Sequence, residues 1–212
     1  MTRPTPLLLA TRSEAKAREV RDILTRFTTA PVRTLRDLAI PPLEDEDGIE
    51  IHETFRANAV AKAEYFARRT GLAVLSDDSG IAVDTIAGAP GVRSRRFCSR
   101  ADLDGVELDQ ANNALLLERL RGVPDERRTA HYVCVAALLD PGRPTTVAIG
   151  TVSGRIAHAP AGSHGFGYDP LFFFPPFGAT FGQTPPALKH AVSHRGRAIR
   201  ALAAVCAGQL RG

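Results

Sequence analysis

Short apolar runs of strand length alternate along this chain with stretches in which apolar residues recur at helical spacing. The runs at residues 7–10 and 72–75 predict two buried strands. Apolar residues at helical spacing follow the first run between Val20 and Phe27, and they recur across residues 54–69, where Gly71 is well placed to end the helix. The pattern therefore predicts a strand, a turn and a helix at the start of the chain, followed later by a second helix and a second strand.

The remaining chain continues the mixture. Residues 31–47 indicate a strand and a loop rich in proline and acidic residues, 108–120 a helix, 132–139 a strongly apolar strand, and 194–210 a closing helix. Residues 145–149 and 153–157 predict two further strands separated around Gly154, as in a hairpin. No internal repeat is visible. The pattern favours one α/β domain over residues 1–212, built as two lobes around a substrate cleft.

Composition narrows the protein class. With 212 residues, 44% hydrophobic and 24% charged, the chain is long enough for a sizeable core, and it lacks the roughly 20-residue apolar run of a membrane span. The start leads into a run of strand length rather than a secretory signal, so we expect a cytoplasmic protein with no membrane partner. Cys98, Cys134 and Cys206 have neither zinc-site nor disulfide-framework spacing, and we expect them to be reduced.

The net charge of +4 favours an anionic partner, but phosphorylated small molecules satisfy it as well as nucleic acid does. Of the 27 basic residues, only Lys16, Lys62 and Lys189 are lysine. Such a bias either leaves a few lysines at random or keeps them where a compact point charge is needed. Their location decides between the two interpretations.

Four segments carry candidate chemistry. The first is the predicted strand-to-helix turn, where amides at a helix start, hydroxyls and a lysine suit a polyphosphate. Thr11 and Glu14 also have capping-box spacing, so an ordinary capped helix explains the same residues. The candidate substrate contacts are Thr11, Arg12, Ser13, Glu14, Ala15 and Lys16.

The second segment is the pair Asp77 and Asp78 at the predicted end of the second strand. Adjacent carboxylates there can coordinate Mg²⁺ and orient or deprotonate a water, and Glu50 is the natural third oxygen ligand. The alternative is a tight turn, because Asp-Asp-Ser-Gly is favourable turn chemistry.

The third and fourth segments lie near the C-terminus. Residues 165–170 form a glycine-rich turn beside a phenylalanine-rich run, which suits a planar base, although this segment taken alone favours a core strand after a tight turn. Lys189 and the sequence Ser193-His194-Arg195 put cations and donors at a helix start, suited to phosphate or a keto oxygen. None of the four segments is specific alone.

Taken in order, the segments resemble the inosine triphosphate pyrophosphatase family. The carrying motifs are the turn at 11–16, Thr54-Phe55 with Asn58 and Lys62, Asp77-Asp78-Ser79-Gly80 through residues 88–92, the run at 165–170, and Lys189 with 193–195. All three lysines fall inside them, which favours a functional placement. The resemblance implies an elongated mixed α/β sheet flanked by helices, a homodimer, no nucleic-acid partner, and hydrolysis of ITP, dITP and XTP to a monophosphate and pyrophosphate.

The resemblance also implies the roles. The turn at 11–16 holds the triphosphate, Glu50 and Asp78 hold Mg²⁺, and Asp78 accepts the proton of the attacking water, with Asp77, Lys16 and Lys62 completing the catalytic set. Substrate contacts come from Ser79, Phe166, Gly167, Tyr168, Asp169, Lys189, His194 and Arg195.

Two departures stand out. Ser13 replaces the family's usual asparagine, and the segment 51–53 lacks its usual glycine, so Asp47 or Glu53 is an alternative to Glu50 as ligand. Two rival functions remain open, namely a pyrophosphatase for modified pyrimidine nucleotides and a non-enzymatic RNA- or nucleotide-binding module, although the phenylalanine-rich segment lacks the interleaved basic residues of the latter.

Overall fold

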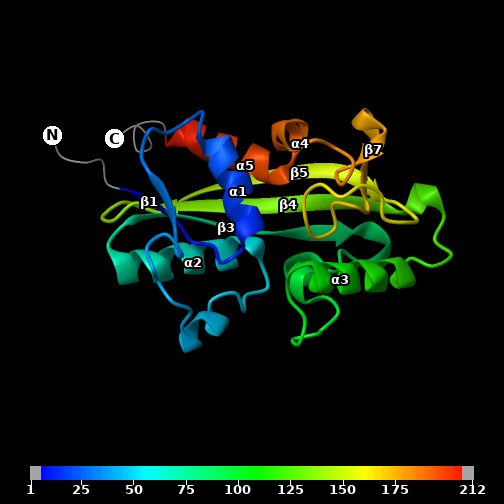
Figure 1. Cartoon of the computed structure of the whole chain (residues 1–212), viewed down its shortest axis with the longest axis horizontal. Coiled ribbons are helices and arrows are strands. Elements are labelled where there is room, and N and C mark those ends of the chain that lie inside the picture. Colours follow the sequence, from blue (N-terminus) through cyan, green and yellow to red (C-terminus); the bar gives the residue numbers. More distant parts are fainter. Residues whose placement is uncertain (1–5, 207–212) are drawn as a thin grey trace. The chain divides into compact units, whose positions relative to one another are not determined.

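The computed structural model describes residues 6–206, apart from the side chain of Asp47, and its seven strands form one open sheet (Figure 1). The strand order is β2-β1-β3-β4-β5-β6-β7. β1 runs parallel to β2 and β3, whereas β6 runs antiparallel to β5 and β7, so the predicted mixed sheet is confirmed. The strands are β1 (Leu7–Leu9), β2 (Val32–Thr34), β3 (Ala73–Val83), β4 (Thr129–Leu139), β5 (Thr146–Ile156), β6 (Phe172–Phe174) and β7 (Ala179–Thr180).

Helices flank the sheet, as predicted for an α/β fold. They are α1 (Glu14–Leu24), α2 (Phe55–Thr70), α3 (Gly105–Arg119), α4 (Pro186–Val192) and α5 (His194–Val205), with short 3₁₀ helices such as Glu44–Gly48 and Gly91–Arg96 between them. The predicted end of the last helix at 206–210 falls largely outside the described residues. Within 6–206, no helix combines the length and apolar character needed to cross a membrane.

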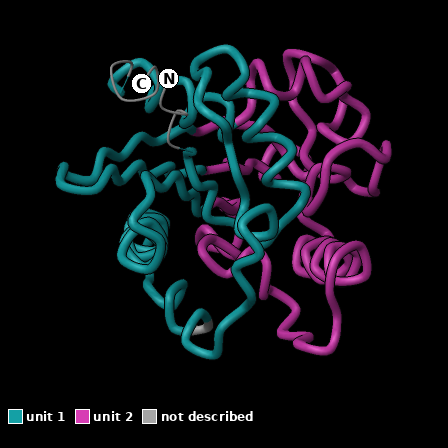
Figure 2. Tube along the Cα trace, turned by 60° about the vertical axis from the view of Figure 1, so that its left-hand side comes forward, with its two compact units in different colours: residues 1–78, 134–150, 194–212 teal, residues 79–133, 151–193 magenta. Residues whose placement is uncertain are grey.

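The chain divides into two compact units, each assembled from separate stretches of sequence (Figure 2). Unit 1 contains residues 1–78, 134–150 and 194–212, and unit 2 contains 79–133 and 151–193. Three of the four boundaries fall inside β3, β4 and β5, so these three strands contribute residues to both units, and the fourth lies between α4 and α5.

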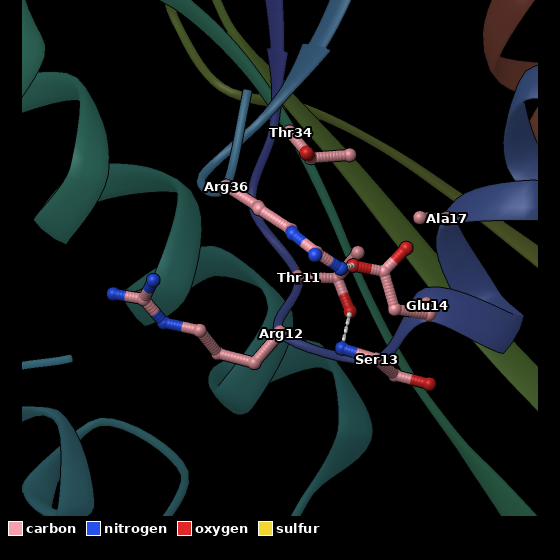
Figure 3. A pocket seen from close by; sticks show the side chains of 7 residues that line it. All are labelled: Thr11, Arg12, Ser13, Glu14, Ala17, Thr34 and Arg36. Carbon is pink, nitrogen blue, oxygen red and sulfur yellow. Dashed lines mark hydrogen bonds and ion pairs between the residues drawn. The ribbon is translucent and has the colours of Figure 1, made fainter. Parts of the chain in front are cut away.

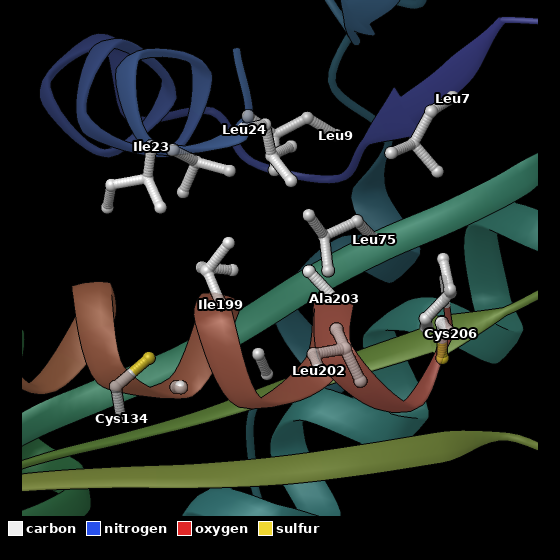
Figure 4. Packing of buried hydrophobic residues seen from close by; sticks show 14 of the residues in the cluster. Leu7, Leu9, Ile23, Leu24, Leu75, Cys134, Ile199, Leu202, Ala203 and Cys206 are labelled. Atoms are coloured by element: carbon white, nitrogen blue, oxygen red, sulfur yellow. The ribbon is translucent and has the colours of Figure 1, made fainter. Parts of the chain in front are cut away.

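Unit 1 buries apolar side chains on both faces of its strands. On one face, Leu7, Leu9 and Leu75 pack against Ile23 of α1 and Ile199 of α5 (Figure 4). The intervening residues of the same strands, such as Leu8 and Val74, pack against α2 on the opposite face. Because successive residues of a strand point to opposite faces, a strand buried on both sides appears as a continuous apolar run.

Unit 2 has its own core, which is rich in aromatic rings. Tyr132 of β4 packs against Phe172, with ring centroids 4.6 Å apart, and Phe181 lies 4.9 Å from Phe172. Leu116 and Leu120 from the α3 region pack into the same cluster. The phenylalanine-rich segment is therefore largely core.

Two strand predictions were wrong. β3 does not end before Asp77 and Asp78 but continues through them to Val83, which excludes the turn alternative. Gly80 is needed there because a side-chain Cβ would lie 2.4 Å from the carbonyl oxygen of Gly91. Likewise β5 is a single strand, because Gly154 accommodates the carbonyl of Phe173, which a Cβ would approach to 2.5 Å.

Other differences are local. The helix cap is Ser13 rather than Thr11: Ser13 Oγ accepts from the backbone N–H of Lys16, and Thr11 Oγ1 accepts from the N–H of Ser13. Helix α3 begins three residues before the predicted 108. The pattern did not predict α4 or β7, which are too short to show a period. Strand β6 is the core strand that the phenylalanine-rich run allowed after its tight turn. In contrast, Gly71 ends α2 as expected, and Thr54, the first residue of the predicted helix, is its N-cap.

Candidate active site

Asp77 lies at the centre of a buried ionic network in unit 1. Lys16 Nζ lies 3.6 Å from Asp77 Oδ2, and Arg195 Nε donates to the same oxygen at 3.2 Å. The second arm of the Arg195 guanidinium donates through Nη1 to Glu19. Asp77, Arg195 and Glu19 are all buried. Cations from α1 and α5 therefore meet one carboxylate in the middle of β3.

Asp78, on the next position of β3, is held from the side of α2. Asn58 Nδ2 donates to Asp78 Oδ2 at 2.9 Å, and four positions further along α2 the amine of Lys62 donates to Glu50. Lys62 also interacts electrostatically with both aspartates. Helix α2 thus brings Glu50 into the group by way of Lys62.

The two aspartates differ in their acid–base character. Burial by itself raises the pKa of Asp77, but Lys16, Arg195 and Lys62 outweigh it and hold that pKa well below its usual range. For Asp78, burial is the dominant influence, and its pKa is raised despite Lys16 and Lys62. Burial by itself raises the pKa of Glu50, but the charges of Lys62 and Lys16 outweigh burial, and the pKa of Glu50 lies below its usual value. Asp77 is therefore the fixed anion and Asp78 the better proton acceptor.

The donor set fits Mg²⁺. Glu50, Asp77 and Asp78 offer only carboxylate oxygens, the ligands that magnesium prefers. Across the described residues, no three His, Cys, Asp or Glu side chains form a complete metal cage. Magnesium uses one or two carboxylates together with waters and substrate phosphates, so a cage is not required.

The structure distinguishes Glu50 from its two alternatives as a metal ligand. Glu50 is paired with Lys62 beside the aspartates, whereas Glu53 is exposed, and the side chain of Asp47 is not among the described residues. The geometry favours Glu50.

Around the start of α1 there is a cavity (Figure 3). Arg12 is turned away from it, because its guanidinium donates to Glu46 and to the carbonyl oxygens of Ile40 and Pro41. Arg12 thus anchors the 40–46 segment instead of presenting a free fork to phosphate. The lining residues are Thr11, Arg12, Ser13, Glu14, Ala17, Thr34 and Arg36.

In unit 2 the predicted base-binding turn is fixed by buried polar contacts. Asp169 Oδ2 accepts from the backbone N–H of Phe166 at 2.9 Å and from Lys189 Nζ at 2.5 Å. The N–H of Gly167 donates to Asp109 of α3 at 2.7 Å. Gly165 has φ +75°, and a Cβ there would lie 2.0 Å from Asp169 Oδ2. Gly165 therefore permits the close approach of Asp169, whereas Gly167 is favoured only by its positive φ of +62°.

Lys189 combines its ion pair with aromatic contacts. Its Nζ lies 5.2 Å from the centroid of the Phe166 ring and 5.9 Å from that of Phe181. Tyr168 is buried and donates through its hydroxyl to the carbonyl of Ser94. Of this group, Phe166 is only half-buried, so its ring has an accessible side.

The other predicted contacts are placed as follows. His194 opens α5 and is buried in unit 1, while Ser79 is half-buried in β3 and belongs to unit 2. Ala15 lies half-buried in the first turn of α1. Sequence reasoning missed Glu19, although a glutamate between the apolar positions Ala17 and Val20 indicates a buried charge that needs a partner.

Comparisons with known proteins identify the family of the whole chain. Residues 7–205 match the model of the Ham1 family. The chain is 45% identical over 197 residues to a dITP/XTP pyrophosphatase of Frankia alni, covering 93% of this chain and 95% of that protein. A dITP/XTP pyrophosphatase of Geobacter sulfurreducens is 43% identical over 198 residues, covering 93% and 94% of the two chains.

Solved structures give the same result. A HAM1 protein from Coxiella burnetii matches with a TM-score of 0.80 and 32% identity, covering 96% of this chain and 99% of the other. A dITP/XTP pyrophosphatase from Mycobacterium abscessus matches with a TM-score of 0.69 and 40% identity, covering 94% and 98%. Family model, relatives and folds agree over nearly the whole length, and the chain therefore belongs to the Ham1 family.

Proposed function

We propose that this protein is a Mg²⁺-dependent pyrophosphohydrolase that converts ITP, dITP and XTP to the nucleoside monophosphate and pyrophosphate, removing deaminated purine nucleotides from the precursor pool. The observation that carries the proposal is the pair Asp77 and Asp78 in β3, with Lys16 and Lys62 converging on it from two helices. The names of the relatives from Frankia and Geobacter support the same reaction.

In unit 1 we assign the triphosphate and the metal. The start of α1 offers backbone amides, the hydroxyls of Thr11 and Ser13, and the ammonium of Lys16 to phosphate oxygens. Glu50 and Asp78 would hold Mg²⁺. When bound, the ion supplies charge neutralisation of the phosphates and a template for them.

The protein's own share of the chemistry is proton transfer and charge stabilisation. Asp78 accepts the proton of the water that attacks phosphorus, while the bond between the α and β phosphates breaks and pyrophosphate leaves with its electron pair. Lys16 and Lys62 offset the negative charge that develops on the phosphate oxygens. Asp77 keeps Lys16 in place.

In unit 2 we assign base contacts to the turn of Phe166, Gly167, Tyr168 and Asp169, with Lys189 and Ser79. In unit 1, we assign His194 as a further substrate contact. We leave the Arg195 side chain out of this set because its guanidinium is bound to Glu19 and Asp77. Hypoxanthine and xanthine carry a keto oxygen where adenine carries an amino group, and a donor facing that amino group would be left unpaired, which discriminates strongly.

The testing experiment measures pyrophosphate release by purified protein with Mg²⁺ from ITP, dITP, XTP, ATP, GTP and modified pyrimidine triphosphates. We expect the first three to react far faster than ATP and GTP. Equal rates on all substrates contradict the specificity, and selective turnover of the pyrimidines favours the rival enzyme class. Salt-dependent oligonucleotide binding without hydrolysis would replace the proposal with a binding module. The homodimer implied by the sequence resemblance is part of the proposal, and light scattering measures it.

A further inference from the structure

Glu19 and Arg195 belong to the buried network of unit 1, but the proposed mechanism gives neither side chain a role. Its carboxylate accepts from Arg195 Nη1, and Arg195 Nε donates to Asp77 Oδ2 at 3.2 Å. Glu19 is 7% exposed, and Arg195 and Asp77 are each 1% exposed. The guanidinium therefore joins two carboxylates that come from different elements, α1 and β3.

Stability alone does not account for this arrangement. Charges buried together usually contribute no more to folding than apolar side chains of similar size, because their desolvation offsets their attraction. Glu19 also occupies the face of α1 that buries Val20 and Ile23 in an apolar cluster, where an apolar residue would pack directly. What a planar guanidinium between two carboxylates does provide is a fixed geometry.

That geometry bears on the reacting groups. Glu19 and Lys16 are three positions apart on α1 and so lie on the same side of the helix. Lys16 contacts Asp77 directly at 3.6 Å, and Glu19 reaches the same oxygen through Arg195. Helix α1 therefore contacts Asp77 directly through Lys16 and indirectly through Glu19 and Arg195. Without the Glu19 charge, Arg195 loses the carboxylate that its Nη1 contacts, and the Asp77–Lys16 contact is no longer fixed from both sides.

We propose that Glu19 is a positioning residue for pyrophosphate release, acting through Arg195 to fix Asp77 beside Lys16. The inference rests on the proposed function, since it assigns Glu19 a part in that reaction. It predicts that the charge of Glu19 matters for turnover more than for substrate binding.

The test compares Glu19→Gln with Glu64→Gln, a control in α2 that removes the charge of a half-buried glutamate paired with Arg68 at 3.7 Å. With ITP and Mg²⁺, we expect kcat of Glu19→Gln to fall roughly 10- to 100-fold, as small misplacements of reacting groups do. We expect KM to change less than about threefold, since the substrate's own contacts remain. Urea unfolding establishes that the variant is folded under assay conditions. An unchanged kcat, or a loss confined to stability, overturns the inference.

A second comparison tests the route through Arg195. If Glu19 acts through that residue, Glu19→Gln lowers kcat no further in an Arg195→Met background, and an additional tenfold loss contradicts the proposal. If Glu19→Gln does not fold, the double variant Glu19→Met/Arg195→Met removes both charges with apolar side chains. It should fold and have the low kcat of Arg195→Met, whereas wild-type kcat overturns the inference. Failure of the wild-type protein to release pyrophosphate instead contradicts the proposed function.

Discussion

Asn58 Nδ2 donates to Asp78 Oδ2 at 2.9 Å and so ties the proposed proton acceptor to helix α2. The side chain of Asn58 is itself fixed, because its Oδ1 accepts from the N–H of His52 and its Nδ2 also donates to the carbonyl oxygen of His52. The Asp78 carboxylate is thus oriented by a side chain that is itself held in place.

This contact makes Asp78→Asn an informative variant. The amide oxygen of the new side chain can still accept from Asn58, so the fold should persist, but the side chain no longer takes up a proton. We expect pyrophosphate release to fall about 10²- to 10⁴-fold, the usual contribution of a general base. Steady-state assays with ITP and a urea unfolding curve measure the two effects. Asp22→Asn, an exposed change on α1, is the control, and near-normal turnover by Asp78→Asn would place the base elsewhere.

Metal dependence distinguishes the three acidic candidates in the 47–53 segment. Chelation with EDTA should abolish pyrophosphate release, and added Mg²⁺ should restore it. Because Glu50 is drawn toward the aspartates by Lys62, Glu50→Gln should raise the Mg²⁺ concentration needed for half-maximal rate, about 10-fold or more. Glu53→Gln and Asp47→Asn are the matched controls. A larger shift in either of them than in Glu50→Gln would reassign the ligand.

Much of the fold could be predicted because its signals are local. The helix over 55–70 has an apolar period, a threonine cap and a terminal glycine, and each of these acts within a few residues. The two errors at Asp77–Gly80 and at Gly154 share a physical cause. In both places glycine is required by a distant backbone segment that approaches closely, and a sequence read locally shows the same glycine as a turn.

The site was predictable in its residue types but not in its pairings. The lysines, aspartates and glycines stand out by motif order, yet nothing local indicates that Arg12 binds the 40–46 segment or that Arg195 is directed at Asp77. These pairings join residues 28 to 118 positions apart, so only the folded chain establishes them. Glu19 could have been suspected from its place on an apolar helix face, but its partner could not.

The pair Lys189–Asp169 should be costly to break from one side. Both side chains are buried, and Asp169 also accepts from the backbone of Phe166, so Lys189→Met leaves a buried carboxylate without its cation. We expect a loss of about 3–5 kcal/mol in the free energy of unfolding. The double variant Lys189→Met/Asp169→Asn removes the charge but keeps an acceptor for Phe166, and it should recover most of that loss. Urea unfolding followed by circular dichroism measures all three proteins. Equal stabilities of the single and double variants would show that charge is not the cause.

Thiol reactivity provides a probe of the core around Asp77 that does not depend on activity. Cys134 and Cys206 are buried, whereas Cys98 is half-buried. Burial, reinforced by the nearby charge of Asp77, raises the pKa of the Cys134 thiol, so this group remains protonated well above neutral pH. Because the thiolate is the reactive form, a colorimetric disulfide reagent at pH 8 should modify Cys98 first and Cys134 only as fast as the protein unfolds. Cys98→Ser should remove the early phase, and all the remaining thiols should react at once in denaturant. Early reaction of Cys134 in the native protein would mean that the interior beside Asp77 is open to solvent, and the burial on which the Asp77–Arg195 pair depends would be wrong.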